Sequence, residues 1–437
     1  MNKPISVIFI GVGARGSKYA QLMAADPEHY QGVGVADPDK ARNKRIQQLF
    51  DLPDDACFNS WEDILAKPKM ADLAVIATLD DMHYEPAMKA IELGYDLLLE
   101  KPVAPTPEQC AAIANAAKKK GVRVLVCHVL RYTPFFAKIK ELLRDGIIGD
   151  VMSGLAVEAV GNVHQSHSYV RGNWHSEKDS SPMLLAKSCH DLDIIQWLLD
   201  KPCKKIQSFG DLLHFKAENA PEGAPVRCVD GDCPVRETCP YDCIRLYTKE
   251  ERYKTWFRPA CTRGIAKDAA NPTVDEVMEA LRTTDYGLCV YHANNDVVDQ
   301  QTVNMQFEGG TTFTFSMNAF NIKGGRYIRL FGTEGELFAR ASDTEITVRR
   351  FDQKEPIMVA VPKVEESIVG GHGGGDQGIV RELYQYLSED YTGFRAANIH
   401  TSVRNHMLCF AAEESRHNDT VVDIGAFMKK HELDNQY

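Results

Sequence analysis

The sequence predicts an α/β protein with two domains, 1–130 and 131–437, and two observations support this prediction. Over the first 130 residues, β-rich apolar runs alternate with stretches of helical periodicity, which is the pattern of a doubly wound parallel sheet of the Rossmann type. Beyond residue 130, several β-rich stretches alternate apolar with polar residues, as an antiparallel sheet with one solvated face does. We therefore expect a second α/β domain with a large, mainly antiparallel open sheet.

The composition is that of a soluble globular protein. The chain has 437 residues, enough for two cores, with 44% hydrophobic and 25% charged residues. Its net charge of −11 argues against nucleic-acid binding, and no apolar run is long enough to span a membrane. The first strand starts at about Ile5, leaving no room for a signal peptide, and single cysteines such as Cys57 and Cys127 lie in apolar contexts. We expect a cytoplasmic protein that has neither nucleic acid nor a membrane as its partner.

The first domain begins with a strand at 5–10 and a glycine-rich turn, Gly11-Val12-Gly13-Ala14-Arg15-Gly16, followed by a helix at 18–25. A strand before this motif and a helix after it are the context that dinucleotide binding requires. Gly11 allows the tight turn, Gly13 lets the backbone approach a pyrophosphate, and Gly16 lets the helix pack closely on the strand. With Ala14 and Arg15, these glycines form the predicted phosphate-binding turn.

The cofactor is expected to be NAD. A second strand at 32–36 ends in Asp37, at about the distance from the glycine turn where a carboxylate accepts hydrogen bonds from an adenosine ribose. The same carboxylate would repel a 2′-phosphate, which makes NADP the less favoured cofactor. Lys40 and Arg42 lie nearby and oppose that preference.

The remaining elements of this domain continue the alternation, with strands at 72–77, 95–99 and 122–126 and helices at 61–66, 84–93 and 108–120. The strand at 95–99 runs into Glu100-Lys101-Pro102, so two charges lie at a carboxyl edge where open α/β sheets bind ligands. The proline keeps the backbone of Lys101 extended. Lys101 could act on a substrate hydroxyl or be an ordinary solvated charge. Thr78 and His83 flank the loop after the neighbouring strand, where His83 could line a nicotinamide pocket or cap the next helix.

The second domain begins at the junction Arg131-Tyr132-Thr133-Pro134, followed by a helix at 135–144 and a strand at 151–160. Further β-rich stretches lie at 206–209, 303–307, 311–317, 326–331, 336–338 and 345–351, and helices at 378–387, 403–417 and 425–431. The region from about 211 to 288 is expected to be an insertion. A helix at 188–199 carries His190 and Asp193 on one face, where the histidine could be a general acid or base or could cap its own helix.

In this order, the glycine turn with Asp37, Glu100-Lys101-Pro102, and His190-x-x-Asp193 with Trp197-Leu198 make the chain resemble the glucose–fructose oxidoreductase and inositol dehydrogenase family (Gfo/Idh/MocA). The resemblance implies a Rossmann domain and an α/β domain whose open sheet often forms an oligomer interface, hence a homo-oligomer (dimer or tetramer). It implies that Lys101 and His190 face a carbohydrate substrate beside the nicotinamide. The lysine would hold the reacting hydroxyl, and the histidine would take its proton. Arg131, Lys187 and Asp193 are further expected substrate contacts.

The chain departs from that pattern at one position. Many dehydrogenases of the family carry an aspartate four residues before the histidine, where this chain has Ala186. Asp191 or Asp193 could substitute. We expect an NAD-dependent oxidoreductase acting on a secondary alcohol of a sugar, sugar acid or cyclitol. The alternative is an NAD-dependent glycosidase or anhydro-sugar enzyme that oxidises, eliminates and reduces again with no net redox change. A regulator that only senses NAD would leave Lys101 and His190 unexplained.

Further candidate substrate contacts are polar and aromatic groups at 164–174, because sugar sites combine a stacking face with planar polar groups. They are His167, Arg171, Asn173 and Trp174, and the arginine would suit an acidic sugar. A polar surface loop is the other reading. His372 in the glycine-rich stretch 370–376 is also a candidate, with a mobile connector as its alternative.

Four cysteines lie close together within the insertion, at Cys228, Cys233, Cys239 and Cys243. Four thiols in so short a span of a cytoplasmic protein indicate a tetrahedral site, most plausibly structural zinc. A metal would help a segment without a large core to stay folded. The spacing is not that of a CxxC pair, and disulfides or unpaired thiols are the alternatives.

Overall fold

The computed structural model describes residues 3–268, 271–363, 373–388 and 391–433. Its N-terminal part is a six-stranded sheet in which every strand pair is parallel, in the order β3-β2-β1-β4-β5-β6. This is the order of a Rossmann fold, and the direction of winding reverses between β1 and β4, where such sheets bind ligands. The predicted doubly wound sheet is confirmed. Its strands are β1 (Ile5–Ile10), β2 (Tyr30–Ala36), β3 (Cys57–Phe58), β4 (Leu73–Ile76), β5 (Asp96–Leu99) and β6 (Val124–Val126).

The helices of this domain start and stop at local signals. In α5, Thr106 accepts a hydrogen bond from Gln109 N–H at 3.2 Å, and Gly121 ends the helix with a φ of 74° that glycine adopts easily. In α2, Asp39 accepts from the first helical N–H groups. The helices are α1 (Ala14–Ala24), α2 (Lys40–Phe50), α3 (Trp61–Leu65), α4 (Tyr84–Leu93) and α5 (Pro107–Lys120).

The second domain is built on a nine-stranded sheet in the order β14-β13-β12-β11-β7-β10-β9-β8-β15. Within the described part of this sheet, only β10 and β7 pair in parallel, so the expected open and mainly antiparallel sheet is confirmed. Buried and more exposed residues alternate along β9 and β10, as in a sheet with one covered face. The strands are β7 (Val151–Gly161), β8 (Cys203–Asp211), β9 (Gln300–Phe307), β10 (Thr312–Asn321), β11 (Gly325–Gly332), β12 (Gly335–Arg340), β13 (Glu345–Arg350), β14 (Ile357–Ala360) and β15 (Val422–Asp423).

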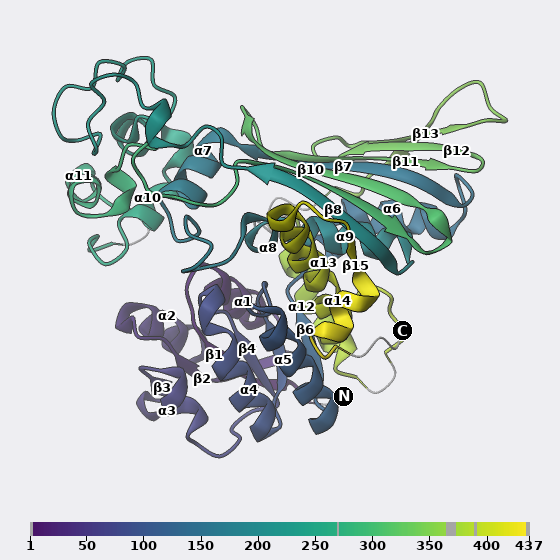
Figure 1. Ribbon diagram of the computed structural model, residues 1–437. Coiled ribbons are helices and arrows are strands. Elements are labelled where there is room, and N and C mark those ends of the chain that lie inside the picture. The colour runs from purple at the N-terminus through teal and green to yellow at the C-terminus, as the bar shows by residue number, and fades with distance from the viewer. Residues whose placement is uncertain (1–2, 269–270, 364–372, 389–390, 434–437) are drawn as a thin grey trace.

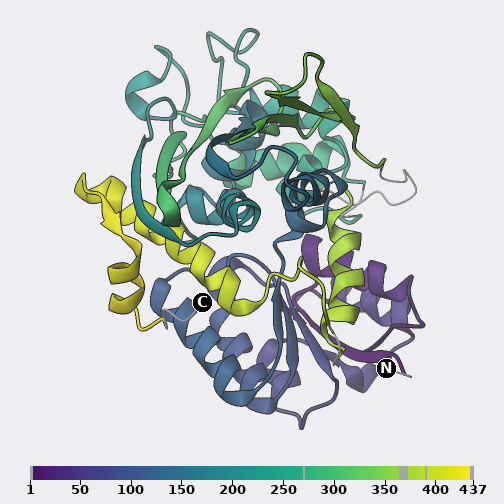
Figure 2. The same ribbon diagram turned by 90° about the vertical axis from the view of Figure 1, so that its right-hand side faces the viewer.

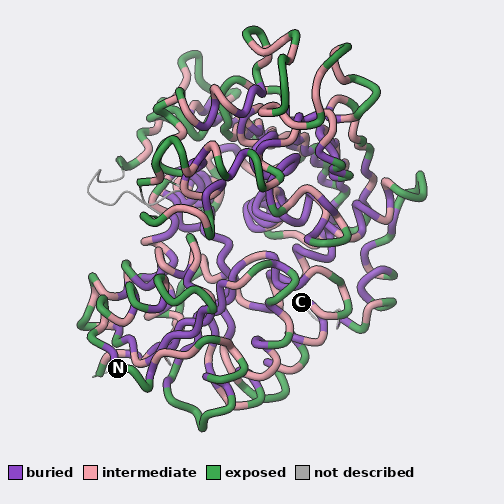
Figure 3. Tube along the Cα trace, turned by 90° about the vertical axis from the view of Figure 1, so that its left-hand side faces the viewer, coloured by how far each residue is buried: buried purple, intermediate pink, exposed green. Residues whose placement is uncertain are grey.

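Helices fill the space between the two sheets (Figure 1). The longest, α13 (Ile399–Asn418), packs against β8 on one side and against α5 and α9 on the other, and thereby joins the domains. Figure 3 shows that the buried stretches are concentrated in the sheets and in these helices. No helix among the described residues is both long and apolar enough to cross a membrane. The layer consists of α6 (Pro134–Arg144), α8 (Met183–Ala186), α9 (Cys189–Leu199), α13 and α14 (Ile424–Lys430).

One helix of the C-terminal part returns to the first domain. In Figure 2, α12 (Gly375–Tyr386) lies beside the N-terminal helices, and it contacts α1. Tyr30 Oη donates a hydrogen bond to Val380 O at 2.6 Å, and Val380 and Leu383 share a hydrophobic cluster with Val7 and Phe9. The sequence prediction assigns everything after residue 130 to the second domain. Within that range, α12 packs on the core of the first.

The expected insertion leaves the large sheet after β8 and returns to it at β9, at the upper left of Figure 1. Asp211 and Gln300 face each other across these two strands, so the insertion replaces a hairpin turn. It ends just before residue 300 rather than at 288. It contains α10 (Phe257–Cys261) and α11 (Val274–Thr283) and packs on α7 (Asn162–Gln165) and the π-helical segment Ser166–Val170.

Candidate functional site

The glycine turn has the geometry of a dinucleotide site. Gly11 has a φ of 77°, and a Cβ atom there would lie 2.8 Å from Ala77 O. A Cβ on Gly16 would lie 2.0 Å from Gly11 O, so the close approach of α1 to the turn requires glycine. At Gly13 a Cβ would meet only Arg42 Nη1, at 3.9 Å. The space beside Gly13, at the N-terminus of a helix without a side-chain cap, is the kind of cradle that a pyrophosphate fills.

Asp37 is tied to this turn. Its Oδ2 accepts a hydrogen bond from Val12 N–H at 2.8 Å and its Oδ1 accepts one from Asp39 N–H at 2.9 Å. Arg42 Nη1 lies 3.7 Å from Asp37 Oδ1. The carboxylate expected to receive the ribose therefore also holds the glycine turn in shape, and a guanidinium stands beside it.

Lys101 joins the two domains. It follows β5, and its Nζ donates a hydrogen bond to Ala186 O at 2.6 Å, at the end of α8 and four residues before His190. Its backbone N–H donates to Glu100 Oε2 at 2.9 Å. The lysine thus reaches from the carboxyl edge of the Rossmann sheet to the segment that leads into the histidine helix.

Glu100 and Arg15 form a brace rather than open cofactor ligands. Arg15 Nε donates to Glu100 Oε1 at 2.7 Å, and its two terminal nitrogens donate to Asp376 at 3.0 and 2.7 Å. Burial alone would raise the pKa of Glu100, but the charges of Arg15 and Lys101 and hydrogen bonds from Arg15 and Tyr19 hold that pKa below its usual value. The brace ties the glycine turn, the end of β5 and the start of α12 together.

His83 supports the turn that carries Lys101. Its Nδ1 lies 2.6 Å from Pro102 O, its Nε2 lies 3.3 Å from Thr78 O, and the ring is almost fully buried. It makes no side-chain capping bond to α4. Thr78 Oγ1 donates to Met82 O at 3.0 Å. Of the two roles expected for His83, the helix cap is wrong, because both ring nitrogens face carbonyls of the neighbouring loops.

His190 is buried at the start of α9 and belongs to a row of three imidazoles. Its ring lies edge-on to that of His128 at a centroid distance of 5.8 Å, and His128 lies edge-on to His406 at 5.4 Å. Burial lowers the pKa of His128 to about 4 and that of His406 to about 3, so both are neutral at pH 7. His406 Nε2 accepts from Val103 N–H at 3.0 Å, which assigns the proton to its Nδ1, 2.7 Å from Ser402 O.

Asp193 and Arg131 pair with one another. Arg131 Nε and Nη2 donate to the two carboxylate oxygens at 2.7 and 2.6 Å, and Asn405 Nδ2 donates as well. Burial would raise the pKa of Asp193, but the charge of Arg131 outweighs it and lowers that pKa. Both residues are expected to bind substrate. In the structure their polar atoms are buried and bonded to each other at the base of the histidine helix.

Lys187 and Asp191 belong to a second charge network behind α9. Lys187 Nζ lies 3.1 Å from Glu158 Oε1, and Arg326 Nε lies 2.9 Å from Glu158 and 2.7 Å from Asp191. Lys187, expected to contact substrate, thus pairs with a buried carboxylate in this structure. Asp191 pairs with Arg326 of β11, and Asp193 pairs with Arg131.

The segment 164–174 contacts both the insertion and the first domain. His167 stacks on Phe257 at 4.1 Å with its Nδ1 2.7 Å from Tyr247 Oη, and Arg171 donates to Leu288 O and Tyr241 O at 2.7 and 2.8 Å. Both side chains, expected to contact substrate, make these contacts with the insertion.

Trp174 instead reaches the first domain. Its Nε1 donates to Asp80 Oδ2 at 3.0 Å, in the loop after β4, and Asn173 beside it is exposed. His372 lies outside the described residues.

The predicted tetrathiolate site is not assembled. Among the described residues, no three cysteine sulfurs lie within 4.8 Å of one another, and the twelve cysteines are free thiols. Cys228 N–H donates to Gly287 O at 2.9 Å, and Cys243 Sγ lies 3.8 Å from the same carbonyl oxygen. In the described structure the four cysteines therefore do not form the expected tetrahedral site.

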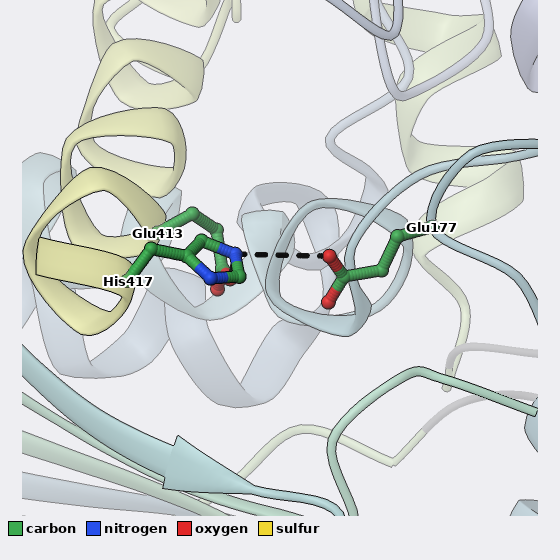
Figure 4. A group of neighbouring side chains, drawn as sticks. All are labelled: Glu177, Glu413 and His417. Atoms are coloured by element: carbon green, nitrogen blue, oxygen red, sulfur yellow. Dashed lines mark ion pairs between the residues drawn. The ribbon is translucent and has the colours of Figure 1, made fainter.

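A different group has its donor atoms close enough together for a metal ion. Glu177, Glu413 and His417 lie within 4.8 Å of one another (Figure 4), with His417 Nε2 3.8 Å from Glu177 Oε2. Arg416 already bridges the two carboxylates, 2.9 Å from Glu177 and 2.6 Å from Glu413. Burial and the charges of Glu413 and Asp296 raise the pKa of Glu177 to about 7. The arginine supplies the positive charge, so we interpret the group as an ion-pair cluster.

The sequence prediction missed His128, Asp80, Asn405 and His406. His128 follows β6 and Asp80 follows β4, so both stand at the carboxyl edge of the sheet, the same signal that identified Lys101. Asn405 and His406 lie inside α13, where nothing in the local pattern separates them from ordinary helix residues.

Both domains match models of a known protein family. Residues 5–128 match the model of an oxidoreductase family described as an NAD-binding Rossmann fold, and residues 140–424 match its C-terminal alpha/beta domain. The oxidoreductase YteT of Bacillus subtilis is 25% identical over 401 residues, which cover 87% of this chain and 88% of YteT. An oxidoreductase structure from Agrobacterium radiobacter in complex with NAD+, L-tartaric acid and magnesium has a TM-score of 0.67 at 14% identity, covering 97% of this chain and 99% of that one.

Two relatives with assigned reactions match over about half of their own length. The 2,7-anhydro-N-acetylneuraminate hydratase of Escherichia coli is 26% identical over 204 residues, 46% of this chain and 51% of that protein. An inositol 2-dehydrogenase/D-chiro-inositol 3-dehydrogenase of Lactiplantibacillus plantarum is 26% identical over 214 residues, 48% of this chain and 57% of that protein.

Proposed function

The chain belongs to the Gfo/Idh/MocA oxidoreductase family, and we propose that it is an NAD-dependent oxidoreductase acting on a secondary alcohol of a sugar, sugar acid or cyclitol. The observation that carries the proposal is the bond from Lys101 Nζ to Ala186 O, which holds an ammonium at the carboxyl edge of the Rossmann sheet close to His190. A charged donor and an imidazole beside a dinucleotide turn are the groups that alcohol oxidation needs.

In the proposed reaction, Lys101 and His190 act on the substrate hydroxyl. NAD, held by the glycine turn and Asp37, would supply the hydride acceptor or donor for the carbon that carries this hydroxyl. Lys101 donates a hydrogen bond to the hydroxyl oxygen and stabilises its negative charge as the proton leaves. His190 takes that proton on oxidation and returns it on reduction. The neutral His128 behind His190 adds no positive charge that would oppose protonation of the catalytic ring.

The cofactor is proposed to be NAD, held by Gly11, Gly13, Gly16 and Asp37. The fit rests on the open side of Gly13 and on the uncapped start of α1, which can receive a pyrophosphate. The carboxylate of Asp37 favours a ribose 2′-hydroxyl over a 2′-phosphate.

The proposed substrate contacts are those at the domain junction. Trp174 bonds to Asp80 in the loop after β4, so its indole lies beside the carboxyl edge of the sheet, and Asn173 is exposed next to it. An aromatic face with neighbouring polar groups is typical of a carbohydrate site.

A homo-oligomer in the cytoplasm is also proposed, assembled through the outer face of the large sheet. That face carries the exposed side chains of Phe338 and Met358, and a cavity of about 500 Å³ lies between Tyr327, Arg329 and Phe338. Burying such apolar surface between subunits would stabilise a dimer or tetramer.

A second candidate is an anhydro-sugar enzyme or glycosidase that oxidises its substrate transiently and reduces it again. It is favoured by Ala186, which stands where dehydrogenases of the family carry an aspartate, and by the hydratase among the relatives. In that cycle the carbonyl formed beside Lys101 would acidify the neighbouring carbon and allow elimination.

One screen separates the candidates. The purified protein is incubated with NAD and a panel of sugars, sugar acids, cyclitols and anhydro sugars, and both NADH and carbohydrate products are followed. Stoichiometric NADH supports the oxidoreductase. A converted carbohydrate without net NADH supports the second candidate. Absence of both for every compound, while NAD binds, would contradict both proposals and favour a binding protein.

A further inference from the structure

We propose that the cavity between α6 and α12 binds a small molecule through a doubly charged phosphate group, which belongs either to inorganic phosphate or to a phosphorylated sugar. Neither Lys101 nor His190 lines this cavity, so the site is separate from the proposed reaction. Three features of the molecule support the proposal: a cavity at the domain junction, an excess of positive charge in its lining, and two cations of that lining without a carboxylate partner.

The cavity has a volume of about 620 Å³, which lies in the range of pockets for small molecules. One wall is the first half of α6, with Ala137 and Lys138. The other wall is one face of α12, where Gln377, Arg381 and Gln385 are spaced four residues apart. A ligand in this cavity therefore contacts the helix layer of the second domain and the helix that packs on the first.

The turn Val129–Tyr132 fixes the distance between the two walls. Gly378 of α12 lies so close to this turn that a Cβ atom there would stand 2.6 Å from the Cβ of Tyr132. Tyr132 Oη accepts a hydrogen bond from Ala397 N–H at 3.2 Å, and the turn leads directly into α6. Because packing positions the walls before a ligand binds, the entropic cost of binding is low.

Positive charges outnumber negative charges in the lining of the cavity. Four side chains are cationic and two are carboxylates, in a protein whose net charge is −11. An excess of two positive charges is close to the charge of a phosphate monoester at neutral pH, with the opposite sign. The cations are Lys138, Lys363, Arg381 and Arg395, and the carboxylates are Glu141 and Glu382.

Both carboxylates of the lining already have partners. Glu141 Oε1 lies 3.3 Å from Arg395 Nη2, and its Oε2 lies 3.4 Å from Lys138 Nζ. Glu382 Oε1 accepts a hydrogen bond from Tyr391 Oη at 2.5 Å. The carboxylates therefore compensate two of the four cations and leave the other two.

The two remaining cations are Arg381 and Lys363. In the part of the chain that the structure describes, neither forms an ion pair with a carboxylate. An arginine offers phosphate oxygens a planar pair of donors, and a lysine offers a point charge. Gln377 and Gln385 flank Arg381 on α12, and their amides can hydrogen-bond the hydroxyls of a phosphorylated sugar.

Isothermal titration calorimetry of the full-length protein tests the site with inorganic phosphate and with glucose 6-phosphate. Each titration is made with and without saturating NAD, because the glycine turn is a second place that attracts phosphate. The ionic strength is held at about 0.15 M, so that long-range attraction is screened. We expect one phosphate group bound per chain in both conditions, with a Kd of about 1 mM or below. A lower Kd for glucose 6-phosphate identifies a sugar phosphate as the ligand, and equal Kd values identify free phosphate.

Two single variants locate the binding. Arg381→Gln and Lys363→Gln should each weaken the binding of both probes about tenfold, because each removes one cation that has no carboxylate partner. Both side chains are exposed, so circular dichroism should show the fold and the melting temperature of the wild type. The matched control is Arg340→Gln, an exposed arginine of β12 outside the cavity, which should keep the wild-type Kd.

Four results would overturn the proposal. They are no heat of binding for either probe in the wild-type protein, binding that NAD abolishes, a Kd that both lining variants leave unchanged, and an equal loss of affinity in Arg340→Gln. Because the experiment measures binding and not turnover, phosphate can bind at this cavity even if the screen for NAD-dependent oxidation fails, and the oxidation can be found even if phosphate does not bind.

Discussion

The ammonium of Lys101 donates a hydrogen bond to the backbone carbonyl of Ala186 at 2.6 Å. The contact uses the main chain, so it does not depend on the residue type at 186. It fixes the lysine through a neutral acceptor, and it joins the strand end of one domain to the helix start of the other.

Replacing Lys101 by Met should remove turnover while NAD still binds. The thioether can neither hold a hydroxyl nor stabilise its charge, and such groups contribute factors of about 10² to 10⁴ to a rate. Turnover and NAD affinity are measured side by side, with Lys89→Met, an exposed lysine paired with Glu92, as the matched control. Full activity of Lys101→Met would exclude the lysine from the chemistry.

Asp37→Ala should weaken NAD binding by about tenfold, or ~1.4 kcal/mol, because the ribose loses an acceptor and Val12 N–H loses its bond. Arg42, 3.7 Å from that carboxylate, would then face an incoming 2′-phosphate without a competitor. Titration calorimetry should therefore show the NADP affinity rising relative to NAD, and the double variant with Arg42→Ala should lose that gain. If Asp37→Ala kept the wild-type preference for NAD over NADP, the ribose would not bind at Asp37.

Asp193→Asn should destabilise the protein by about 3–5 kcal/mol, because it leaves the Arg131 guanidinium buried without its counter-charge. Urea unfolding followed by circular dichroism measures the change. The matched control is Glu92→Gln, which removes an exposed partner and should leave the midpoint where it is. Wild-type stability of Asp193→Asn would mean that Arg131 finds another acceptor.

Stability should rise as the pH falls through 7, and Glu177 should account for part of the rise. Its folded pKa of about 7 lies above the ordinary value of 4.5, so the ionised form is the destabilised one. The destabilisation of the folded protein by the ionised Glu177 carboxylate is complete above pH 7. It decreases as the pH falls and is absent below about 4.5. Glu413, Asp296, Arg416 and His417 surround the group.

Thermal unfolding from about pH 8 to about pH 5 checks this dependence. Glu177→Gln should melt higher than the wild type at the alkaline end and lose part of the slope. Glu414→Gln on α13, which removes a partly exposed partner of Lys430, is the control that should keep the slope. If the melting temperature depended on pH equally in all three proteins, Glu177 would not titrate within this pH range.

Local signals explain why the first domain could be predicted from the sequence. The predicted helix 108–120 is α5, starting one residue earlier, because Thr106 and Gly121 mark its ends within the chain itself. The position of Lys101 at the carboxyl edge of the sheet could be predicted for a related reason. A residue directly after a buried parallel strand stands at the ligand edge, whatever the rest of the fold does.

Contacts between distant segments explain why several residues expected to bind substrate contact other side chains of the protein instead. Arg131 and Asp193 are 62 residues apart, and only packing of α9 on the turn Val129–Tyr132 turns two candidate ligands into one ion pair. His167 stands in a polar, aromatic segment that suits a sugar, but Phe257 and Tyr247 of the insertion cover it from far along the chain. A segment rich in polar and aromatic residues can therefore bind a ligand or pack against an insertion, and its sequence does not distinguish the two.

Because Asp211 and Gln300 already face each other on β8 and β9, the chain between them is a replaceable module. The free energy of closing a loop grows only slowly with its length, so the sheet tolerates long and short connections at that point. A short hairpin turn could rejoin the two strands, and a different segment could be grafted there. His167 and Arg171, which the insertion covers, are the side chains that such a redesign would have to make compatible with solvent.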